Sequence, residues 1–519
     1  MTRLRFSISL LGSIWLTACS GSSEPPTLGS GGTPAAGGVT GNGGSNAGGT
    51  VAAGGSQSAS GAPSSGGASS GGTSSASMGG TAAGGANTGG TGTSGANSGG
   101  TSAGGANTGG ANRGGTSAGG TTTGGSSSGG ASAGSSSSGG MSTTGGSTTT
   151  GYPENTGASC AATAGALKKN PKLPDPFAMH DGTRISTKAQ WECRRNEVKK
   201  DIEKYEIGTK PEPPTTTATY SGGKLSVVVT TSSGSITLSS TVSGSGSCVV
   251  IGMNTNSSLV TGCTQVPFMH DQVVGYNNGS GTQVQSDPFY KVYPSLWGKV
   301  GNYSAWSWGI SRLIDGIEKV KDQLKVDTTK IAVHGCSYAG KMALFGGAFD
   351  ERVALTVAQE SGGGGITSWR TSQDFTTRTG TNIEKIDNTS YAWFLSSMKS
   401  LDPYSLPHDH HELVAMIAPR ALIALGNPDY EWLGDESGYK SMMAATEVWK
   451  ALGVPDRVGF DFTGGHTHCA AAASQTTSVK AFVDKFLKGQ TASTTIAIKP
   501  VSSKFDLTYT NDWTTPTLQ

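Results

Sequence analysis

The stretch that decides the fold is Ile331-Ala332-Val333-His334-Gly335-Cys336-Ser337-Tyr338-Ala339-Gly340-Lys341. It begins as a short apolar run typical of a buried strand, passes through a turn of small residues, and continues into a helical stretch ending at Phe349. A strand, a sharp turn and a helix are the context in which a serine nucleophile is held exposed at the end of a sheet. Gly335 and Gly340 permit this close approach, although the common G-x-S-x-G spacing is not kept. Ser337 is therefore the best nucleophile candidate.

A second segment far along the chain, Gly465-His466-Thr467-His468-Cys469, pairs a histidine with a cysteine in the same way. A serine needs a neighbouring base to take its proton, and that base needs a carboxylate partner. A Cys336–Cys469 disulfide would hold the serine turn beside this segment. We therefore expect His468 to be the base, with His466 as the alternative.

The carboxylate partner has two candidate positions. Glu360 ends an apolar strand in Ala358-Gln359-Glu360-Ser361-Gly362-Gly363, where simple solvation of a surface charge does not explain it. Asp429 and Glu431 lie in the loop after the next strand, where many α/β-hydrolases keep their acid. We expect Glu360 to be the acid, with the two later carboxylates as competitors.

Two kinds of strand pattern occur in the rest of the chain. Residues 224–230 and 235–242 are rich in β-branched residues around a Ser-Ser-Gly turn, which predicts a half-exposed antiparallel hairpin. The later strand-like runs are short and wholly apolar: Cys248 to Met253, Ile331 to Gly335, Val353 to Val357, Leu422 to Leu425 and Val458 to Phe462. The helical periods between and after them are Trp306 to Leu324, Lys341 to Phe349, His411 to Ile417, Tyr439 to Leu452 and Gln475 to Leu487. This alternation predicts an α/β protein with a mostly parallel sheet between two helical layers, in the α/β-hydrolase order of serine, acid, histidine.

The composition divides the chain into unequal parts. Of the 519 residues, 82 are glycine, and most lie in a Gly/Ser/Thr/Ala tract from about Gly21 to Gly151. The tract has almost no charge and few large apolar side chains, so burial cannot offset its chain entropy. We expect a signal segment at 1–19, a disordered tether at 20–156 and a catalytic domain at 157–519. A fibrous repeat is the alternative for the tract.

The N-terminus has the pattern of an export signal. Arg3 and Arg5 precede an apolar run from Phe6 to Leu16 that is too short for an ordinary membrane span. The small residues before Cys19 resemble a bacterial lipoprotein signal, in which the cysteine is lipidated; a plain secretory signal is the alternative. We therefore expect an exported protein, lipid-anchored at the outer membrane or cell surface, or secreted. The net charge of +2 gives no reason to expect a nucleic-acid partner.

Six cysteines remain after Cys19, an even number that favours disulfides in an exported chain. We expect the pairs Cys160–Cys193, Cys248–Cys263 and Cys336–Cys469, although fifteen connectivities are formally possible. A metal is the competing use of polar ligands, because His408, Asp409, His410 and His411 are of ordinary zinc-ligand types. No second cluster with ligand spacing accompanies them. We expect no metal, and His411 packed inward at the start of a helix.

Many segments together resemble the glucuronoyl esterases of carbohydrate esterase family 15, over about Cys160 to Gln519. Besides the Gly-Cys-Ser turn they are Ala305 to Arg312, Gln359 to Gly362, Trp369-Arg370, Asp409 to His411, Ile417 to Arg420, Trp432 to Gly434, Ala451 to Val454, His466 to Cys469 and Asp512 to Leu518. The resemblance implies an α/β-hydrolase that cleaves 4-O-methyl-glucuronoyl esters between glucuronoxylan and lignin alcohols without a cofactor. It also implies that Ser337, His468 and Glu360 carry the reaction.

The same resemblance implies sugar contacts for Lys341, Glu384 and Trp432. The elbow departs from the family at Tyr338, where the family normally has an arginine that helps to stabilise the oxyanion. The Tyr338 backbone N–H can still donate, and losing one such donor typically lowers the rate by a factor on the order of 10² to 10³. Two alternatives follow: an esterase of another carbohydrate ester, such as an acetyl or simple uronate ester, or a catalytically weakened glycan-binding surface lipoprotein. We expect a monomer whose only contact with a membrane is the lipid anchor.

Overall fold

The computed structural model describes residues 153–277 and 283–519. The expected signal segment, the Cys19 lipidation site and the tether up to residue 152 lie outside the described residues. The described strands are β1 Thr215–Ser221, β2 Lys224–Thr231, β3 Gly234–Thr241, β4 Val249–Gly252, β5 Thr264–Gln265, β6 Ile331–Cys336, β7 Val353–Gln359, β8 Ala421–Leu425, β9 Val458–Asp461 and β10 Ala497–Ile498. The helices are α1 Lys188–Ile202, α2 Pro288–Val292, α3 Asn302–Lys319, α4 Lys321–Leu324, α5 Tyr338–Phe349, α6 Trp369–Thr379, α7 His410–Ala415, α8 Asp435–Ala451 and α9 Ala473–Phe486.

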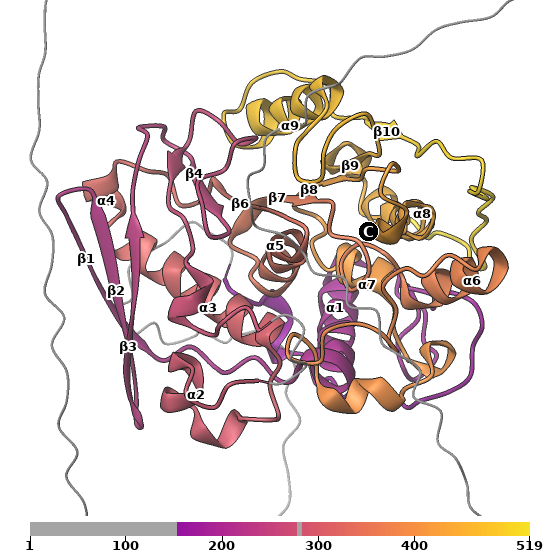
Figure 1. Cartoon of the computed structure of the whole chain (residues 1–519), viewed down its shortest axis with the longest axis horizontal. Helices are drawn as coiled ribbons and strands as arrows, with labels where there is room; N and C mark the ends of the chain where they lie inside the picture. The colour runs from indigo at the N-terminus through magenta and orange to yellow at the C-terminus, as the bar shows by residue number, and fades with distance from the viewer. Residues whose placement is uncertain (1–152, 278–282) are drawn as a thin grey trace, which may run out of the picture. The chain divides into compact units, whose positions relative to one another are not determined.

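The central sheet has the strand order β10-β9-β8-β7-β6-β4-β5, and its neighbouring strands run parallel. Parallel neighbours need crossover connections, and helices supply most of them here. The elbow strand β6 lies inside the sheet between β4 and β7, and α5 follows it directly (Figure 1). The sheet therefore brings the carboxyl ends of β4, β6 and β7 side by side.

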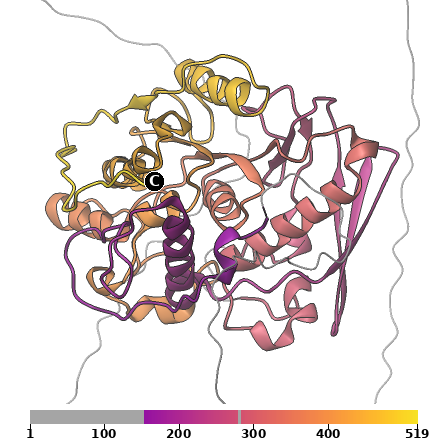
Figure 2. The ribbon, with the colours of Figure 1, turned by 180° about the vertical axis from the view of Figure 1, so that it is seen from behind.

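Successive residues of the central strands face two different apolar layers. Val333, Ala358 and Leu422 belong to the larger core, which includes side chains of α1, α3, α5, α7 and α8. Ala332 and Ile423 belong to a smaller core, to which α9 contributes residues such as Phe482. The helix α9 lies along one face of the central sheet (Figures 1 and 2). Strands buried on both faces read as continuous apolar runs, which explains the sequence pattern. The result is the predicted α/β-hydrolase arrangement of a sheet between helical layers.

The predicted hairpin forms part of a separate antiparallel sheet of β1, β2 and β3. Leu225, Val227 and Val229 alternate with partly exposed residues along β2 and enter the larger core. Val227 packs against Gly316 of α3, where a side chain of any size would collide with it. The small sheet thus covers α3 rather than extending the central sheet (Figure 1).

Among the described residues, Glu154 already contacts the domain, slightly before the boundary expected at 157. Glu154 Oε1 lies 2.6 Å from Lys210 Nζ, and its Oε2 lies 2.5 Å from an Arg312 guanidinium nitrogen. Thr156 donates its backbone N–H and its hydroxyl to the Glu351 carboxylate, each at 2.8 Å. The chain therefore enters the domain through a set of ion pairs with buried cations.

The three disulfides join the pairs expected from the sequence: Cys160–Cys193, Cys248–Cys263 and Cys336–Cys469. The last closes a separation of 133 residues and connects β6 with the loop that follows β9. Within the described ranges, no helix combines the length and apolarity that crossing a bilayer requires.

Candidate active site

The elbow serine has a backbone conformation that is rare for its residue type. Ser337 has φ 60° and ψ −127°, between the end of β6 and the first residue of α5. A Cβ on Gly335 would lie 2.1 Å from the Ala339 carbonyl oxygen, and one on Gly340 would lie 2.3 Å from that of Gln359. Only glycine fits at these two positions. The glycines thus allow the sharp turn that presents the serine at the sheet edge.

A carboxylate and an imidazole meet directly beside this turn. Glu360 Oε2 lies 2.6 Å from His468 Nδ1, and Glu360 Oε1 accepts the Cys469 backbone N–H at 3.1 Å. Glu360 is 1% exposed and has φ 43° at the end of β7, whereas the His468 side chain keeps 27% of its surface. A carboxylate on Nδ1 places the ring proton there, which leaves Nε2 free to act as a base.

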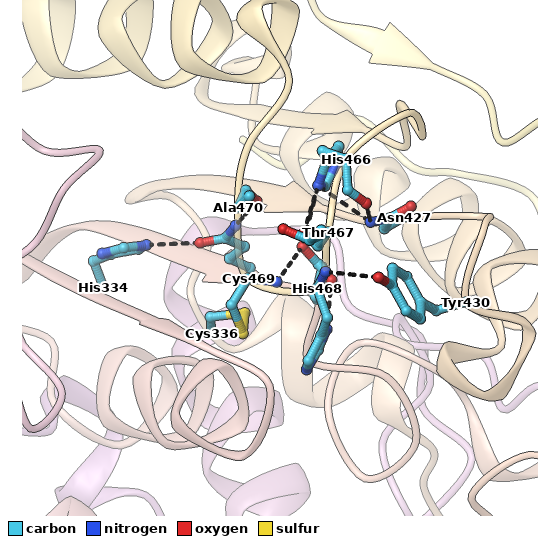
Figure 3. The surroundings of a disulfide bond; sticks show 11 residues. His334, Cys336, Asn427, Tyr430, His466, Thr467, His468, Cys469 and Ala470 are labelled. Carbon is cyan, nitrogen blue, oxygen red and sulfur yellow. Dashed lines mark hydrogen bonds and ion pairs between the residues drawn. A yellow bond between two sulfur atoms is a disulfide. The ribbon is translucent and has the colours of Figure 1, made fainter. Parts of the chain in front are cut away.

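The disulfide holds the two halves of this arrangement together. Cys336 and Cys469 have Cα atoms 5.6 Å apart, and Figure 3 shows the bridge between them beside His468. Ser337 follows Cys336 directly in the sequence, so the same bridge ties it to the histidine segment. The His468 backbone N–H donates to the Tyr430 hydroxyl at 3.1 Å, which fixes the histidine segment from the opposite side (Figure 3). Tyr430 was not singled out from the sequence, where its loop supplied two candidate carboxylates and Trp432.

The competing carboxylates have other partners. Asp429 Oδ2 accepts the Gly465 backbone N–H at 2.5 Å, and Glu431 pairs with Lys504 at 2.6 Å. A third carboxyl, Asp435, is buried at the start of α8, and burial raises its pKa to about 8. It is therefore a neutral acid at pH 7. Among these four acids, a carboxylate contact with His468 is found for Glu360.

The alternative base, His466, lies on the other side of the same segment. Its Nε2 is 2.9 Å from the Thr463 carbonyl oxygen, and its Nδ1 is 3.8 Å from Glu360 Oε1. The Asn427 amide also contacts its ring and its carbonyl oxygen (Figure 3). These contacts use His466 to shape the loop and favour His468 for proton transfer.

The three residues expected to contact a sugar lie at two places: Lys341 and Glu384 form a pair near the elbow, and Trp432 lies beside His468. Lys341, one turn along α5, pairs with Glu384 at 2.7 Å and lies over the Trp393 ring at 5.5 Å from its centroid. Trp432 is 46% exposed, and its ring centroid lies 4.8 Å from that of His468 in an edge-on arrangement. An exposed aromatic face beside the base and a charged pair near the elbow are suitable partners for sugar hydroxyls. Trp393 was not singled out from the sequence.

Tyr338 is held by polar and aromatic partners. Asn254 donates its side-chain amide to the Tyr338 hydroxyl at 2.7 Å, and His270 Nε2 lies 3.2 Å from the same oxygen. The Tyr276 ring centroid is 4.2 Å away, and the Trp393 ring stacks at 6.0 Å. Burial raises the pKa of Tyr338, although the Asn254 bond opposes the rise, so the phenol stays protonated.

Tyr338 also begins α5, and the first amides of a helix lack acceptors within the helix. Its N–H is thus an oxyanion-donor candidate.

The histidine cluster at the start of α7 belongs to a buried ion-pair network. His408 Nε2 and His410 Nε2 lie 2.8 and 2.9 Å from the two oxygens of Glu206, and His411 Nε2 lies 2.9 Å from the Pro174 carbonyl oxygen. Asp409 caps the helix through a box with Glu412. Among the described residues, the one group with metal-ligand atoms clustered within 4.8 Å is Cys336, His468 and Cys469, and its sulfurs form the disulfide. His408 and His410 thus pair with Glu206, and His411 packs inward as expected.

Comparison with known proteins identifies the family. Residues 226–453 match the family model described as fungal glucuronyl esterase. The 4-O-methyl-glucuronoyl methylesterase of Hypocrea jecorina is 39% identical over 377 residues, which cover 70% of this chain and 80% of that enzyme. The chain belongs to the glucuronoyl esterase family.

Solved structures agree with this assignment. The glucuronoyl esterase catalytic domain from Hypocrea jecorina matches with a TM-score of 0.62 and 38% identity, over 68% of this chain and 98% of that one. A mutant glucuronoyl esterase from Sporotrichum thermophile, solved with methyl 4-O-methyl-β-D-glucopyranuronate, matches with a TM-score of 0.62 and 34% identity, over 67% and 96%. This glucuronoyl esterase family member is thus a carboxylic-ester hydrolase with the α/β-hydrolase fold.

Proposed function

We propose that the chain hydrolyses 4-O-methyl-glucuronoyl esters that join glucuronoxylan to lignin alcohols. The observation that carries this proposal is the 2.6 Å contact between Glu360 and His468 on a loop bridged by disulfide to the Ser337 elbow. The relatives named for this activity, and the related structure that holds a methyl glucuronate ester, support the substrate class.

In the proposed reaction Ser337 Oγ attacks the ester carbonyl carbon while His468 Nε2 takes the hydroxyl proton. Glu360 stabilises the resulting imidazolium through Nδ1. The tetrahedral oxyanion accepts the backbone N–H of Tyr338, the position that supplies an oxyanion donor in this fold. The alcohol leaves with the proton from His468, and water then cleaves the acyl-enzyme by the same steps to release the uronic acid.

Substrate binding is proposed for Lys341, Glu384 and Trp432. Lys341 is buried and already paired with Glu384, so the two together offer donors and acceptors to ring hydroxyls without an unpaired buried charge. Trp432 offers an exposed face next to His468. In this proposal the three side chains contact the uronate ring whose carboxyl ester Ser337 attacks.

The placement of the enzyme is part of the proposal. We propose export through the segment 1–19, anchoring by lipid at Cys19 and a tether that begins at residue 20. Three disulfides in the described part support an oxidising compartment. Mass spectrometry of the mature N-terminus tests the anchor; a cleaved chain without a diacylglyceryl cysteine would leave plain secretion.

Substitution of the nucleophile tests the activity. Ser337→Ala should abolish hydrolysis of benzyl glucuronate while binding to glucuronate-bearing xylan persists, because only the attacking oxygen is removed. Initial rates on benzyl glucuronate and 4-nitrophenyl acetate, with pull-down on xylan, measure both properties. Ordinary activity in this variant would place the chemistry elsewhere, and a wild-type enzyme active only on the acetate would indicate another ester class.

A further inference from the structure

A buried histidine three residues before Ser337 connects three neighbouring parts of the sheet. His334 Nδ1 lies 2.8 Å from the Ser257 hydroxyl, in the turn after β4, and His334 Nε2 lies 3.3 Å from Gln359 Oε1 at the end of β7. Gln359 Nε2 donates to the Ala470 carbonyl oxygen at 2.5 Å, two residues after His468 (Figure 3). Both side chains are buried, with 7% and 2% exposure. A continuous polar chain thus crosses the apolar sheet and ends on the histidine segment.

The donors and acceptors of this chain have a single consistent direction. Because Gln359 gives its amide N–H to Ala470, its Oε1 faces His334 as an acceptor, and His334 Nε2 must carry the proton. The bare Nδ1 then accepts the Ser257 O–H, and Ser257 Oγ accepts the Val260 backbone N–H at 2.9 Å. Burial lowers the pKa of His334 to about 4, although the Gln359 bond opposes it, so the ring is neutral at pH 7.

The histidine segment needs such a contact because its backbone is unusual. Cys469 has φ 67°, a left-handed conformation that a non-glycine residue keeps only under constraint from its surroundings. The disulfide fixes the Cys469 side chain, and Glu360 holds its N–H. Gln359 holds the next carbonyl on, that of Ala470, and thereby limits rotation of the segment about the bridge.

We propose that His334 and Gln359 are positioning residues that hold the segment from His468 to Ala470 in the geometry required for proton transfer. The inference rests on the proposed function, because it takes His468 to be the base. Neither side chain touches the substrate in this proposal. Their effect is therefore on kcat rather than on KM.

Two substitutions interrupt this chain of hydrogen bonds, and a third should restore its contact with Gln359. Gln359→Leu removes both amide contacts, and His334→Phe removes both ring nitrogens at similar volume. A displacement of 1 Å at a reacting group can lower a rate on the order of 10²-fold, so we expect each to reduce kcat at least about tenfold while KM changes less than about twofold. His334→Gln places an amide nitrogen near the position of Nε2 and should recover most of kcat.

Two readouts separate this inference from the substrate assignment. One is kcat and KM on benzyl glucuronate; the other is the rate at which a fluorophosphonate labels Ser337, which needs the nucleophile and base but no uronate recognition. Ser337→Ala is the unlabelled control. Fast labelling of a wild type that fails to hydrolyse the glucuronate would contradict the proposed substrate, while slower labelling of the two variants would still support the positioning role.

Matched variants exclude a general effect on the core. Thr356 lies on β7, the strand that carries Gln359, and its buried hydroxyl has no hydrogen-bond partner in the described part of the chain. Thr356→Val should therefore leave labelling unchanged. Ser257→Ala, outside the sheet, removes the hydroxyl that bonds His334 and the Val260 N–H, at the end of the network farthest from His468. It should fold normally and slow labelling by about two- to threefold. Labelling within twofold of wild type in folded Gln359→Leu and His334→Phe would overturn the proposal; if those fail to fold, an unchanged rate in Ser257→Ala would overturn it.

Discussion

Strained residues gather where the proposed reaction takes place. Ser337, Glu360 and Cys469 are non-glycine residues with φ of 60°, 43° and 67°. Such conformations cost on the order of 1–3 kcal/mol each and persist when surrounding contacts impose them. Here the constraints are the close backbone contacts at Gly335 and Gly340, the end of the central sheet and the Cys336–Cys469 disulfide. The proposed nucleophile, the proposed acid and the neighbour of the proposed base are therefore fixed by backbone geometry as well as by side-chain bonds.

Replacing the acid distinguishes the candidate carboxylates. Glu360→Ala should lower kcat on benzyl glucuronate by about 10³ to 10⁴, because the imidazolium loses its partner and Nδ1 its fixed proton. Glu431→Ala, which breaks only an ion pair with Lys504, is the matched control and should stay near wild type. Asp429→Ala loosens the loop through Gly465 and should cost less than tenfold. A larger loss in either later-loop variant would reassign the acid.

Tyr338→Arg restores the side chain that the family's elbow usually carries. A guanidinium aimed at the oxyanion should raise kcat by about tenfold or more with little change in KM, since it acts on the transition state. Unfolding temperature should fall slightly, because the Asn254 amide now donates to the phenol and would face another donor. Steady-state kinetics and thermal unfolding measure the two effects. A folded variant with unchanged or lower kcat would show that this pocket uses the phenol differently.

At the scale of elements, Glu206 connects two parts of the chain. It lies in the π-helical turn Glu203–Ile207, which continues α1, and pairs with His408 and His410 at the start of α7. Burial opposes ionisation of both groups, but their attraction prevails: the pKa of Glu206 is lowered and that of His410 is raised. The neighbouring His411 shows the opposite shift, because burial lowers its pKa. The contributions of these two adjacent histidines to the stability of the fold should therefore change with pH in opposite directions.

This contrast gives a test by pH. A raised histidine pKa stabilises the fold fully below the unfolded pKa, near 6.5, and the contribution is lost as pH rises through the folded pKa. A lowered one contributes above 6.5 and is lost as pH falls through the folded pKa. His410→Gln should therefore destabilise more at pH 6 than at pH 9, by about 3–5 kcal/mol at the lower pH. His411→Gln should show the reverse slope. Denaturant unfolding from pH 5 to 9 measures both, and parallel slopes would contradict the assignment.

Elements that the sequence predicted correctly are those whose apolar periodicity is complete. The β2–β3 hairpin, the strands β4, β6, β7, β8 and β9, and the helices α5, α7, α8 and α9 appear within a few residues of their expected bounds. The single helix expected from Trp306 to Leu324 is two helices, α3 and α4. The helix α1 was missed because its buried face carries charges such as Arg194 and Arg195, which are satisfied by Glu412 and Glu351. Polar α6 was missed for the same lack of an apolar stripe.

The candidate site shows a similar division. Ser337, Glu360 and His468 could be predicted from the order of the motifs and the ends of the strands, because the residues next to each of them in the sequence indicate its position. The contacts of His334 with Gln359 and of Tyr430 with His468 could not be predicted. They are single hydrogen bonds between residues far apart in the sequence, and they depend on how the chain folds. A histidine inside an apolar strand was the one visible sign.

At the scale of the whole molecule, Glu154 fastens the start of the domain. Glu154→Gln removes the charge that faces Lys210 and Arg312, both buried, and should destabilise by roughly 1 to 3 kcal/mol; this lies below the 3–5 of a fully buried pair because Glu154 keeps 20% of its side-chain surface. The activity on benzyl glucuronate at low temperature should not change. Calorimetry measures the loss, with Asp181→Asn, an exposed carboxylate in a turn, as the control. An unchanged melting temperature would show that the entry segment is not held by its charge.

The Cys160–Cys193 bridge gives the molecule a mechanical property. A pull on the chain from the N-terminal side first meets the ion pairs at Glu154 and then the covalent link at Cys160, 33 residues ahead of its partner on α1. Tension therefore passes directly to α1, and the intervening stretch carries none of it. If the protein is fixed to a surface and its polymer substrate drags on it, unpeeling stops at this link, and the hydrolase keeps its shape under load until α1 itself is torn from the core.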